Sequence, residues 1–483
     1  MIAVDRLSTT AVTRLRSLAP VLGWGAAAVV GGSAVAYLVA NGRWYLALGM
    51  ILAVPVAVLV VRHPLATIPI WLVVMPFVSV TDQDSVRQVF WVIHRGLPLI
   101  TLLVIGLGAL SGAAPRRLPR LGWPEILMAG YVVATLVSIL YTSADRVATT
   151  YLWYERIVVP MCLYLIVRLL QPKPAHLRWV APVALFVLLS QSVIGIISWV
   201  SPGVLPQMWL SLVGERTVGS FGDPDVFGTT VLLCGAVLLY IGLSDGRPRI
   251  ARLWPLLCYG LAILMTFLTF SRGNWLAGAV VLLGSLVVYR AHARRMLGFI
   301  AAAGMVLLLS GVLGQQVQFA QRRLASTKSE QTALSRLPVA VAAVRMWQEK
   351  PIAGWGYENF DRFSRPFQTR VGDLVSPEKP HSSHNLFLSI LAEQGVLGFA
   401  LYLGPIAIWL VRSWKAAPAM RASERQLVAG MWLVIAAFVI VNNFSVMRLP
   451  FGLGVWWLTL GLIASIVSRY RTEVGRSGAW SPT

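Results

Sequence analysis

The chain contains about fourteen apolar stretches, many of them long enough to cross a lipid bilayer as a helix. A membrane-spanning helix needs about 20 predominantly apolar residues. Of the 483 residues, 57% are hydrophobic and only 12% are charged, whereas ordinary soluble domains contain about 25% charged residues. The sequence therefore predicts an all-α, polytopic integral membrane protein with about 12–14 transmembrane helices.

The predicted spans follow one another along the chain. They lie near residues 20–40, 45–61, 64–80, 97–113, 123–142, 149–171, 178–200, 225–244, 252–269, 273–289, 296–314, 384–411, 427–444 and 450–468. Some are short for a full crossing, which is why the predicted number is a range. The first span follows Arg6, Arg14 and Arg16 and so resembles a signal peptide, but its apolar stretch of about 20 residues exceeds the 7–15 of a signal core. We expect it to be retained as a transmembrane helix.

The composition excludes several other classes of protein. Cys162, Cys234 and Cys258 all lie in apolar stretches, so a disulfide scaffold is excluded. The 19 Trp and 17 Phe exclude a disordered chain. A net charge of +22 would suggest a nucleic-acid partner for a soluble protein. No nucleic-acid-binding motif accompanies the charge, and basic residues at the cytoplasmic ends of membrane helices explain it, so we predict no nucleic-acid partner.

The distribution of basic residues predicts the orientation. Of the 41 Lys and Arg residues, 23 lie at the termini and in the even-numbered connections between predicted spans, and such residues favour the cytoplasmic side. Both termini are therefore predicted to be cytoplasmic. The connections 81–96, 201–224 and 315–383 are predicted to be extracytoplasmic.

This orientation divides the chain into three parts. Residues 1–314 hold the first eleven predicted spans, residues 315–383 form an extracytoplasmic loop, and residues 384–483 hold the last three spans and a cytoplasmic tail. The loop is far longer than the 2–8 residues usual between packed helices. Within it, residues 333–349 are predicted to form an amphipathic helix on the membrane surface. Its apolar stripe is formed by Leu334, Leu337, Val341, Val344 and Trp347.

Charged residues near membrane depth are energetically expensive and mark candidate functional sites. Four polar segments are predicted to face the extracytoplasmic side. They are Glu155–Arg156, ERTVGSFGDPDVFG from Glu215 to Gly228, Ser271–Arg272–Gly273, and HSSHNLFLSILAEQGVLG from His381 to Gly398. Because all four are predicted on one face, they are treated as parts of one candidate site.

The arginines of these segments suit a diphosphate at a membrane surface. A guanidinium stays charged and matches phosphate oxygens with two parallel hydrogen bonds. Arg216 and Arg272 are the candidates for this role. Two alternatives are that Arg272 anchors a helix end at the membrane interface and that Arg216 pairs with Glu215 or Asp223. Arg156 is expected to pair with an adjacent or facing carboxylate.

His384 is the candidate general base. A neutral imidazole can take a proton from an attacking hydroxyl, and His384 begins the apolar run at the membrane boundary. Alternatively, its ring is satisfied by backbone at a helix entry. His381 is expected to shape the loop; a zinc site formed by the two histidines would lack clear third and fourth ligands. Glu393 lies nine residues after His384. At ~100° per residue of a regular helix, this spacing places the two side chains on opposite faces, so Glu393 is not expected to orient His384.

Other enzyme signatures are missing: the sequence has no Walker loop, dinucleotide fingerprint, HExxH motif or nucleophile elbow. We therefore predict neither a cofactor nor a metal. The energy for a reaction has to come from an activated substrate already in the membrane.

The chain resembles the O-antigen ligase and O-antigen polymerase family of bacterial envelope glycosyltransferases. The resembling stretches are ERTVGSFGDPDVFG, FSRGNW, PIAGWGYENF and SHNLFLSILAEQGVLG. Their order and spacing match over residues 200–410. The chain has about fourteen predicted spans against the twelve usual in ligases, which leaves the acceptor open.

The resemblance implies a lipid-glycosyltransferase-like fold and a set of roles. A glycan would pass from undecaprenyl diphosphate to a hydroxyl of a glycolipid or glycan acceptor, without metal, on the periplasmic side of a bacterial cytoplasmic (inner) membrane. Arg216 and Arg272 match the diphosphate-binding arginines and His384 the catalytic histidine; Arg156, His381 and Asn385 are secondary candidates. A ligase acting on lipid A–core is the first expectation. The alternatives are a polysaccharide polymerase, a protein O-oligosaccharyltransferase and, in a different class, a transporter or flippase, which should show inverted repeats.

Overall fold

The computed structural model describes residues 40–78, 90–112, 118–173, 179–211, 216–244, 253–309, 336–368, 383–446 and 449–477, together with residues 33, 36, 37 and 321. Throughout these residues the chain forms helices and turns without a strand. The predicted all-α class of a polytopic membrane protein is confirmed. The predicted first span, at 20–40, falls almost entirely outside the described residues.

The helices follow the predicted apolar stretches closely. They are α2 (Trp44–Arg62), α3 (Thr67–Val78), α5 (Leu97–Leu110), α6 (Trp123–Thr142), α7 (Arg146–Trp153), α8 (Val159–Leu170), α9 (Val180–Val200), α10 (Pro224–Ser244), α11 (Leu253–Phe267), α12 (Arg272–Val288), α13 (Ala293–Leu309), α16 (Arg336–Glu349), α17 (Phe360–Phe363), α18 (Leu386–Ala416), α19 (Ala422–Asn442) and α20 (Pro450–Ser477). Two π-helical segments, Trp91–Gly96 before α5 and Tyr154–Val158 between α7 and α8, complete the membrane part.

The described residues hold fewer candidate spans than the 12–14 predicted for the whole chain. Seven helices in the described residues are long and apolar enough to cross a membrane, or eight if α12 and the segment Arg290–Ala302, bent by 97°, count as one span. The apolar helices Pro64–Val78 and Leu253–Phe267 are shorter. At a rise of ~1.5 Å per residue, the 15 residues of Leu253–Phe267 reach ~22 Å, less than the ~30 Å of a bilayer core.

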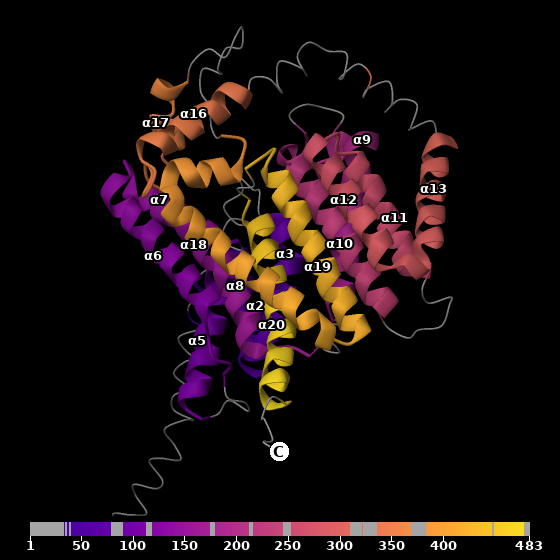
Figure 1. The fold of residues 1–483 in the computed structure, drawn as a ribbon, viewed down its shortest axis with the longest axis horizontal. Helices are drawn as coiled ribbons and strands as arrows, with labels where there is room; N and C mark the ends of the chain where they lie inside the picture. Colours follow the sequence, from indigo (N-terminus) through magenta and orange to yellow (C-terminus); the bar gives the residue numbers. More distant parts are fainter. Residues whose placement is uncertain are drawn as a thin grey trace, which may run out of the picture.

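Helices α10 and α20 lie at the centre of the bundle. In each, 89% of the apolar window is buried, because both are apolar on all sides and are surrounded by other helices. Helix α10 packs against α9, α11 and α19, and α20 packs against α8, α18 and α19. In Figure 1 the yellow α20 runs through the middle of the bundle.

Residues 336–368, here called the arm, cap one end of the bundle, opposite the C-terminus (Figure 1). The predicted helix at 333–349 is confirmed as α16. It packs on the beginning of α18 through a small separate core of Val339, Ala343, Met346, Phe360 and Ala392. The buried face of α16 is therefore not the predicted stripe: Leu337 is exposed, and Val341, Val344 and Trp347 are only partly buried.

A sharp bend in α18 fits the arm to the bundle. Gly395 has φ +64° and ψ −167°, which is not helical. The backbone amide and carbonyl groups near this break form hydrogen bonds with the backbone of the arm. Val396 N donates to Pro351 O (2.8 Å), and Gly356 N donates to Glu393 O (2.6 Å). The first turns of α18 therefore belong structurally to the arm.

The predicted orientation can be tested with single cysteines at exposed positions. Val204 and Ile352, 77% and 72% exposed, lie in connections predicted to be extracytoplasmic, whereas Trp414, 83% exposed, lies in one predicted to be cytoplasmic. In cells permeable only at the outer membrane, we expect a membrane-impermeant thiol reagent to label cysteines at 204 and 352 but not at 414. The parent protein measures background labelling, because Cys162 and Cys234 are buried and Cys258 is partly buried. The reverse pattern would invert the orientation.

Candidate functional site

Two of the four polar segments meet where α10 and α12 begin. The Ser271 hydroxyl donates to the Asp225 carboxylate, and Asn274 Nδ2 donates to Pro224 O (2.8 Å). The Ser271 side chain also accepts from Asn274 N, so it caps α12 and places Arg272 at the first helical position. The loop leading into α10 and the turn before α12 are thus joined by side-chain hydrogen bonds.

Arg216 lies against the same turn. Its Nε donates to Thr269 O (2.9 Å) and its Nη2 donates to Phe270 O (3.4 Å). Phe270 has φ +51°, an uncommon conformation for a bulky residue, which reverses the chain tightly before Arg272. The structure therefore brings the two predicted diphosphate-binding arginines to one turn, although two of the three nitrogens of Arg216 already donate to backbone.

Asp223 also belongs to this cluster. Burial and the neighbouring charge of Asp225 raise the pKa of Asp223, while two backbone amides and the charge of Arg216 oppose that rise. The alternative pairing of Arg216 with Asp223 thus appears as an electrostatic interaction. Glu215, the other carboxylate considered for Arg216, lies outside the described residues.

Arg336, the first residue of α16, was missed by the sequence analysis. Its Nη1 donates to Phe444 O (2.9 Å), just after α19. Burial lowers the pKa of Arg336. The positive charge of Arg272 lowers this pKa further, and the negative charge of Asp225 raises it. A third arginine therefore approaches the cluster from the arm. Nothing local in the sequence distinguished it, because it lies in a loop rich in basic residues.

His384 and Asn385 stand at the start of α18. His384 has φ +52°, the left-handed region that a histidine seldom adopts. Asn385 Oδ1 accepts from Phe387 N and Leu388 N and caps the helix. Asn385 Nδ2 donates to Asn443 Oδ1 (3.1 Å). His381 lies outside the described residues.

The end of α19 connects these parts. Asn443 accepts from Asn385, beside His384, and the next residue, Phe444, accepts from Arg336. On its other side Phe444 packs against Gly273, where an added Cβ would lie 3.3 Å from the Phe444 Cβ. The N-terminal ends of α12, α16 and α18 therefore converge on Asn443 and Phe444.

Arg156 and Glu155 lie apart from this convergence. Arg156 Nη1 pairs with Glu358 Oε1 of the arm (2.6 Å), and Glu155 pairs with Arg95. The expectation that Arg156 pairs with a facing carboxylate is confirmed. The Arg95–Glu155 pair joins the two π-helical segments, and the Arg156–Glu358 pair links the second of them to the arm.

Glu393 binds the backbone of the arm. Its two carboxylate oxygens accept from Glu358 N and Phe360 N, both at 3.1 Å. A buried carboxylate that receives backbone amides rigidifies a turn. As for metal, the described part of the chain holds no group of three or more His, Cys, Asp or Glu side chains able to bind an ion.

Residues 256–403 match the family model described as O-antigen ligase. This region is similar to that family. The predicted resemblance is thereby confirmed, and the family implies a glycosyltransferase of the ligase or polymerase type. The O-antigen ligase region includes Arg272, Arg336 and His384, whereas Arg216 and Asp225 precede it and contact its α11–α12 turn. No curated protein matches the chain.

Proposed function

We propose that this multi-pass membrane protein is an O-antigen ligase-like enzyme that transfers a glycan from undecaprenyl diphosphate to a hydroxyl of lipid A–core, without metal, on the periplasmic side of the inner membrane. One observation carries the proposal: cationic Arg272 and Arg336 and the candidate base His384 lie on elements that converge on Asn443 and Phe444. Such a reaction needs both an anion site and a base.

The arginines would hold the donor. Arg216, Arg272 and Arg336 bring three positive charges to a cluster that also contains Asp223 and Asp225. Arg272 stands in the first turn of α12, where backbone amides and the helix dipole also favour an anion. A diphosphate bound there would leave with its developing charge already neutralised.

His384 would carry out the proton transfer. Its imidazole nitrogen accepts the proton of the acceptor hydroxyl as that oxygen forms a bond to the anomeric carbon. The bond from the anomeric carbon to the diphosphate oxygen breaks, and undecaprenyl diphosphate leaves with the electron pair. Attack opposite the leaving group inverts the anomeric configuration.

Three alternatives to a lipid A–core ligase remain, two of which would use the same donor. A polymerase adds the glycan to another glycan, and a protein O-oligosaccharyltransferase adds it to a protein hydroxyl, both with the same donor. A transporter or flippase would perform no transfer. Arg272 and Arg336 stand at the beginning of α12 and α16, and His384 lies just before α18, rather than at the middle of broken helices, which favours a transferase.

A transfer assay with purified protein separates these alternatives. The protein receives an undecaprenyl-diphosphate-linked glycan with and without a lipid A–core acceptor. We expect a glycosylated acceptor and release of undecaprenyl diphosphate only when the acceptor is present. A lengthened donor glycan would indicate a polymerase, and no diphosphate release under any condition would contradict the proposed function.

Arginine-to-lysine variants test the diphosphate site. Lysine keeps the charge but loses the planar fork, and a hydrogen bond to a charged group contributes about 1.5–3 kcal/mol. We therefore expect Arg272→Lys and Arg216→Lys each to weaken donor binding by roughly one to two orders of magnitude. Arg146→Lys, at an exposed position of α7, is the control and should bind as wild type does. Unchanged donor affinity in both site variants would remove the arginines from the site.

A further inference from the structure

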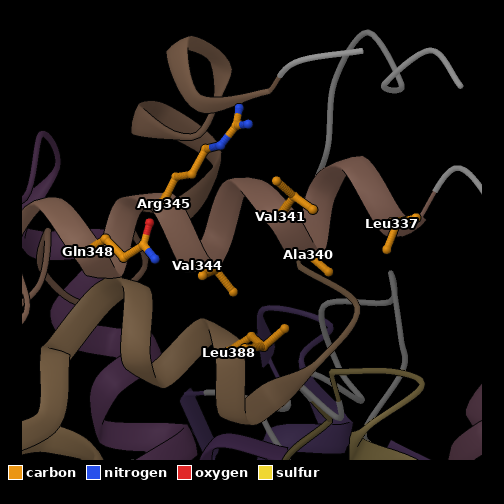
Figure 2. A pocket seen from close by; sticks show the side chains of 7 residues that line it. All are labelled: Leu337, Ala340, Val341, Val344, Arg345, Gln348 and Leu388. Carbon is orange, nitrogen blue, oxygen red and sulfur yellow. The ribbon is translucent and has the colours of Figure 1, made fainter. Parts of the chain in front are cut away.

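An apolar groove runs along α16, beside the start of α18. It has a volume of about 390 Å³ and is lined by Leu337, Ala340, Val341, Val344, Arg345, Gln348 and Leu388. Figure 2 shows Leu337, Ala340 and Val344 along one side of α16, facing Leu388 at the start of α18. The apolar side chains occupy the part nearer the beginning of α16. Arg345 and Gln348 stand toward its C-terminal end.

We propose that this groove binds the first isoprene units of the donor's lipid chain, next to its diphosphate. The proposal rests on the proposed function, because it assigns a subsite for the same donor. The hydrocarbon of a polyprenyl diphosphate begins at the atom bonded to the diphosphate. A site for the diphosphate therefore needs an apolar surface directly beside its cationic groups.

The groove begins where the cationic groups are. Leu337 follows Arg336 in the chain, and Leu388 lies in the first turn of α18, just after His384 and Asn385. Asn385 Nδ2 and Arg336 Nη1 donate to the adjacent residues Asn443 and Phe444. A ligand with its anionic group at Arg336 would therefore have the lining residues Leu337 and Leu388 close by.

The lining favours hydrocarbon over sugar. Five of the seven lining side chains are aliphatic, and sugar hydroxyls placed against them would lose hydrogen bonds to water without replacement. Arg345, whose Nη1 donates to Phe367 O (3.4 Å), and Gln348 bring polar groups to the far end. The groove therefore holds a short length of chain, and the remainder returns to the bilayer.

The packing of α16 explains why this face is open. Val339, Ala343 and Met346 of α16 lie in the small core that it shares with the start of α18. The larger aliphatic residues Leu337, Val341 and Val344 of α16 are exposed or only partly buried and line the groove. An apolar groove on the surface needs an apolar occupant to remove it from water. Because the groove begins next to Arg336, the lipid chain of the donor is the occupant that we propose.

The test compares two water-soluble ligands that differ only in the chain: methyl diphosphate and geranyl diphosphate. Wild type should bind geranyl diphosphate more tightly. Val344→Trp fills the groove and should weaken geranyl diphosphate binding by about tenfold, or about 1.4 kcal/mol, without changing methyl diphosphate binding. Val344→Thr keeps the shape but adds a hydroxyl, so we expect a smaller loss in the same direction. Ile352→Trp, at an exposed position of the arm outside the groove, is the matched control and should change neither.

The outcomes separate failure of the subsite from failure of the function. If wild type binds both diphosphates but Val344→Trp weakens both equally, or weakens neither, the groove does not hold the donor chain while the diphosphate site stands. If Val344→Trp leaves both affinities unchanged and raises only the KM for lipid acceptor, the groove belongs to the acceptor. If wild type binds neither ligand nor undecaprenyl diphosphate, the proposed function itself is contradicted, and the subsite with it.

Discussion

His384→Ala is expected to lower the single-turnover rate by about 10²–10⁴, the contribution usual for a general base, while donor affinity stays near that of wild type. In the proposed mechanism the arginines bind the diphosphate, whereas the imidazole contacts only the acceptor hydroxyl. Donor binding and single-turnover transfer are measured on the same preparation in nanodiscs.

The backbone at His384 requires a second variant. Because φ is +52° there, alanine adds strain that could displace Asn385 and the start of α18. Asparagine tolerates this conformation and has no basic ring nitrogen, so His384→Asn separates the base from the backbone. We expect both variants to lose turnover equally. Normal turnover of His384→Asn, or a loss confined to donor affinity, would remove His384 from the role of base.

Gly395→Ala is expected to destabilise the arm by about 3 kcal/mol or more. The conformation at Gly395, φ +64° and ψ −167°, is open essentially only to glycine. An added Cβ would also collide with the carbonyl groups of Ile352 and Pro351, which accept the hydrogen bonds that fix the bend. Since the segment before the bend carries His384 and Asn385, we expect transfer activity to be lost together with the ordered arm.

Limited proteolysis of the arm between Lys350 and Arg365 and the thermal unfolding temperature measure this effect. Gly106→Ala in α5 is the matched control, because nothing lies within 4 Å of its added Cβ and its conformation is ordinary. There alanine should be neutral or stabilising by about 0.5–1 kcal/mol, since it reduces the freedom of the unfolded chain. A Gly395→Ala protein as resistant and as active as wild type would show that the bend is dispensable.

The bounds of most helices were predictable because the signal is local. Helix α6 was predicted at 123–142 and occupies Trp123–Thr142, and α10 was predicted at 225–244 and occupies Pro224–Ser244. Each stretch of apolar residues satisfies its own backbone hydrogen bonds as a helix, whatever its neighbours are.

Apolar length alone did not determine where a helix ends or bends. Leu253–Phe267 is apolar throughout but stops after 15 residues, and α12 meets its continuation at 97°. Hydropathy is a sum over residues, whereas a bend or an early end depends on how a helix packs against its neighbours. The same limit applies to α16, where the helix was predicted correctly and its buried face was not.

By itself the sequence determined the all-α membrane class, the positions of most helices and the residue types suited to a lipid diphosphate, because hydropathy and side-chain chemistry belong to each segment separately. Only the tertiary structure decided which of these residues meet. Arg216 reaches Thr269 across 53 positions of sequence, and Arg336 reaches Phe444 across 108. Such contacts depend on the packing of helices between them, which no local pattern encodes, so Arg336 became visible as a site residue only when α16 was seen beside the ends of α12 and α19.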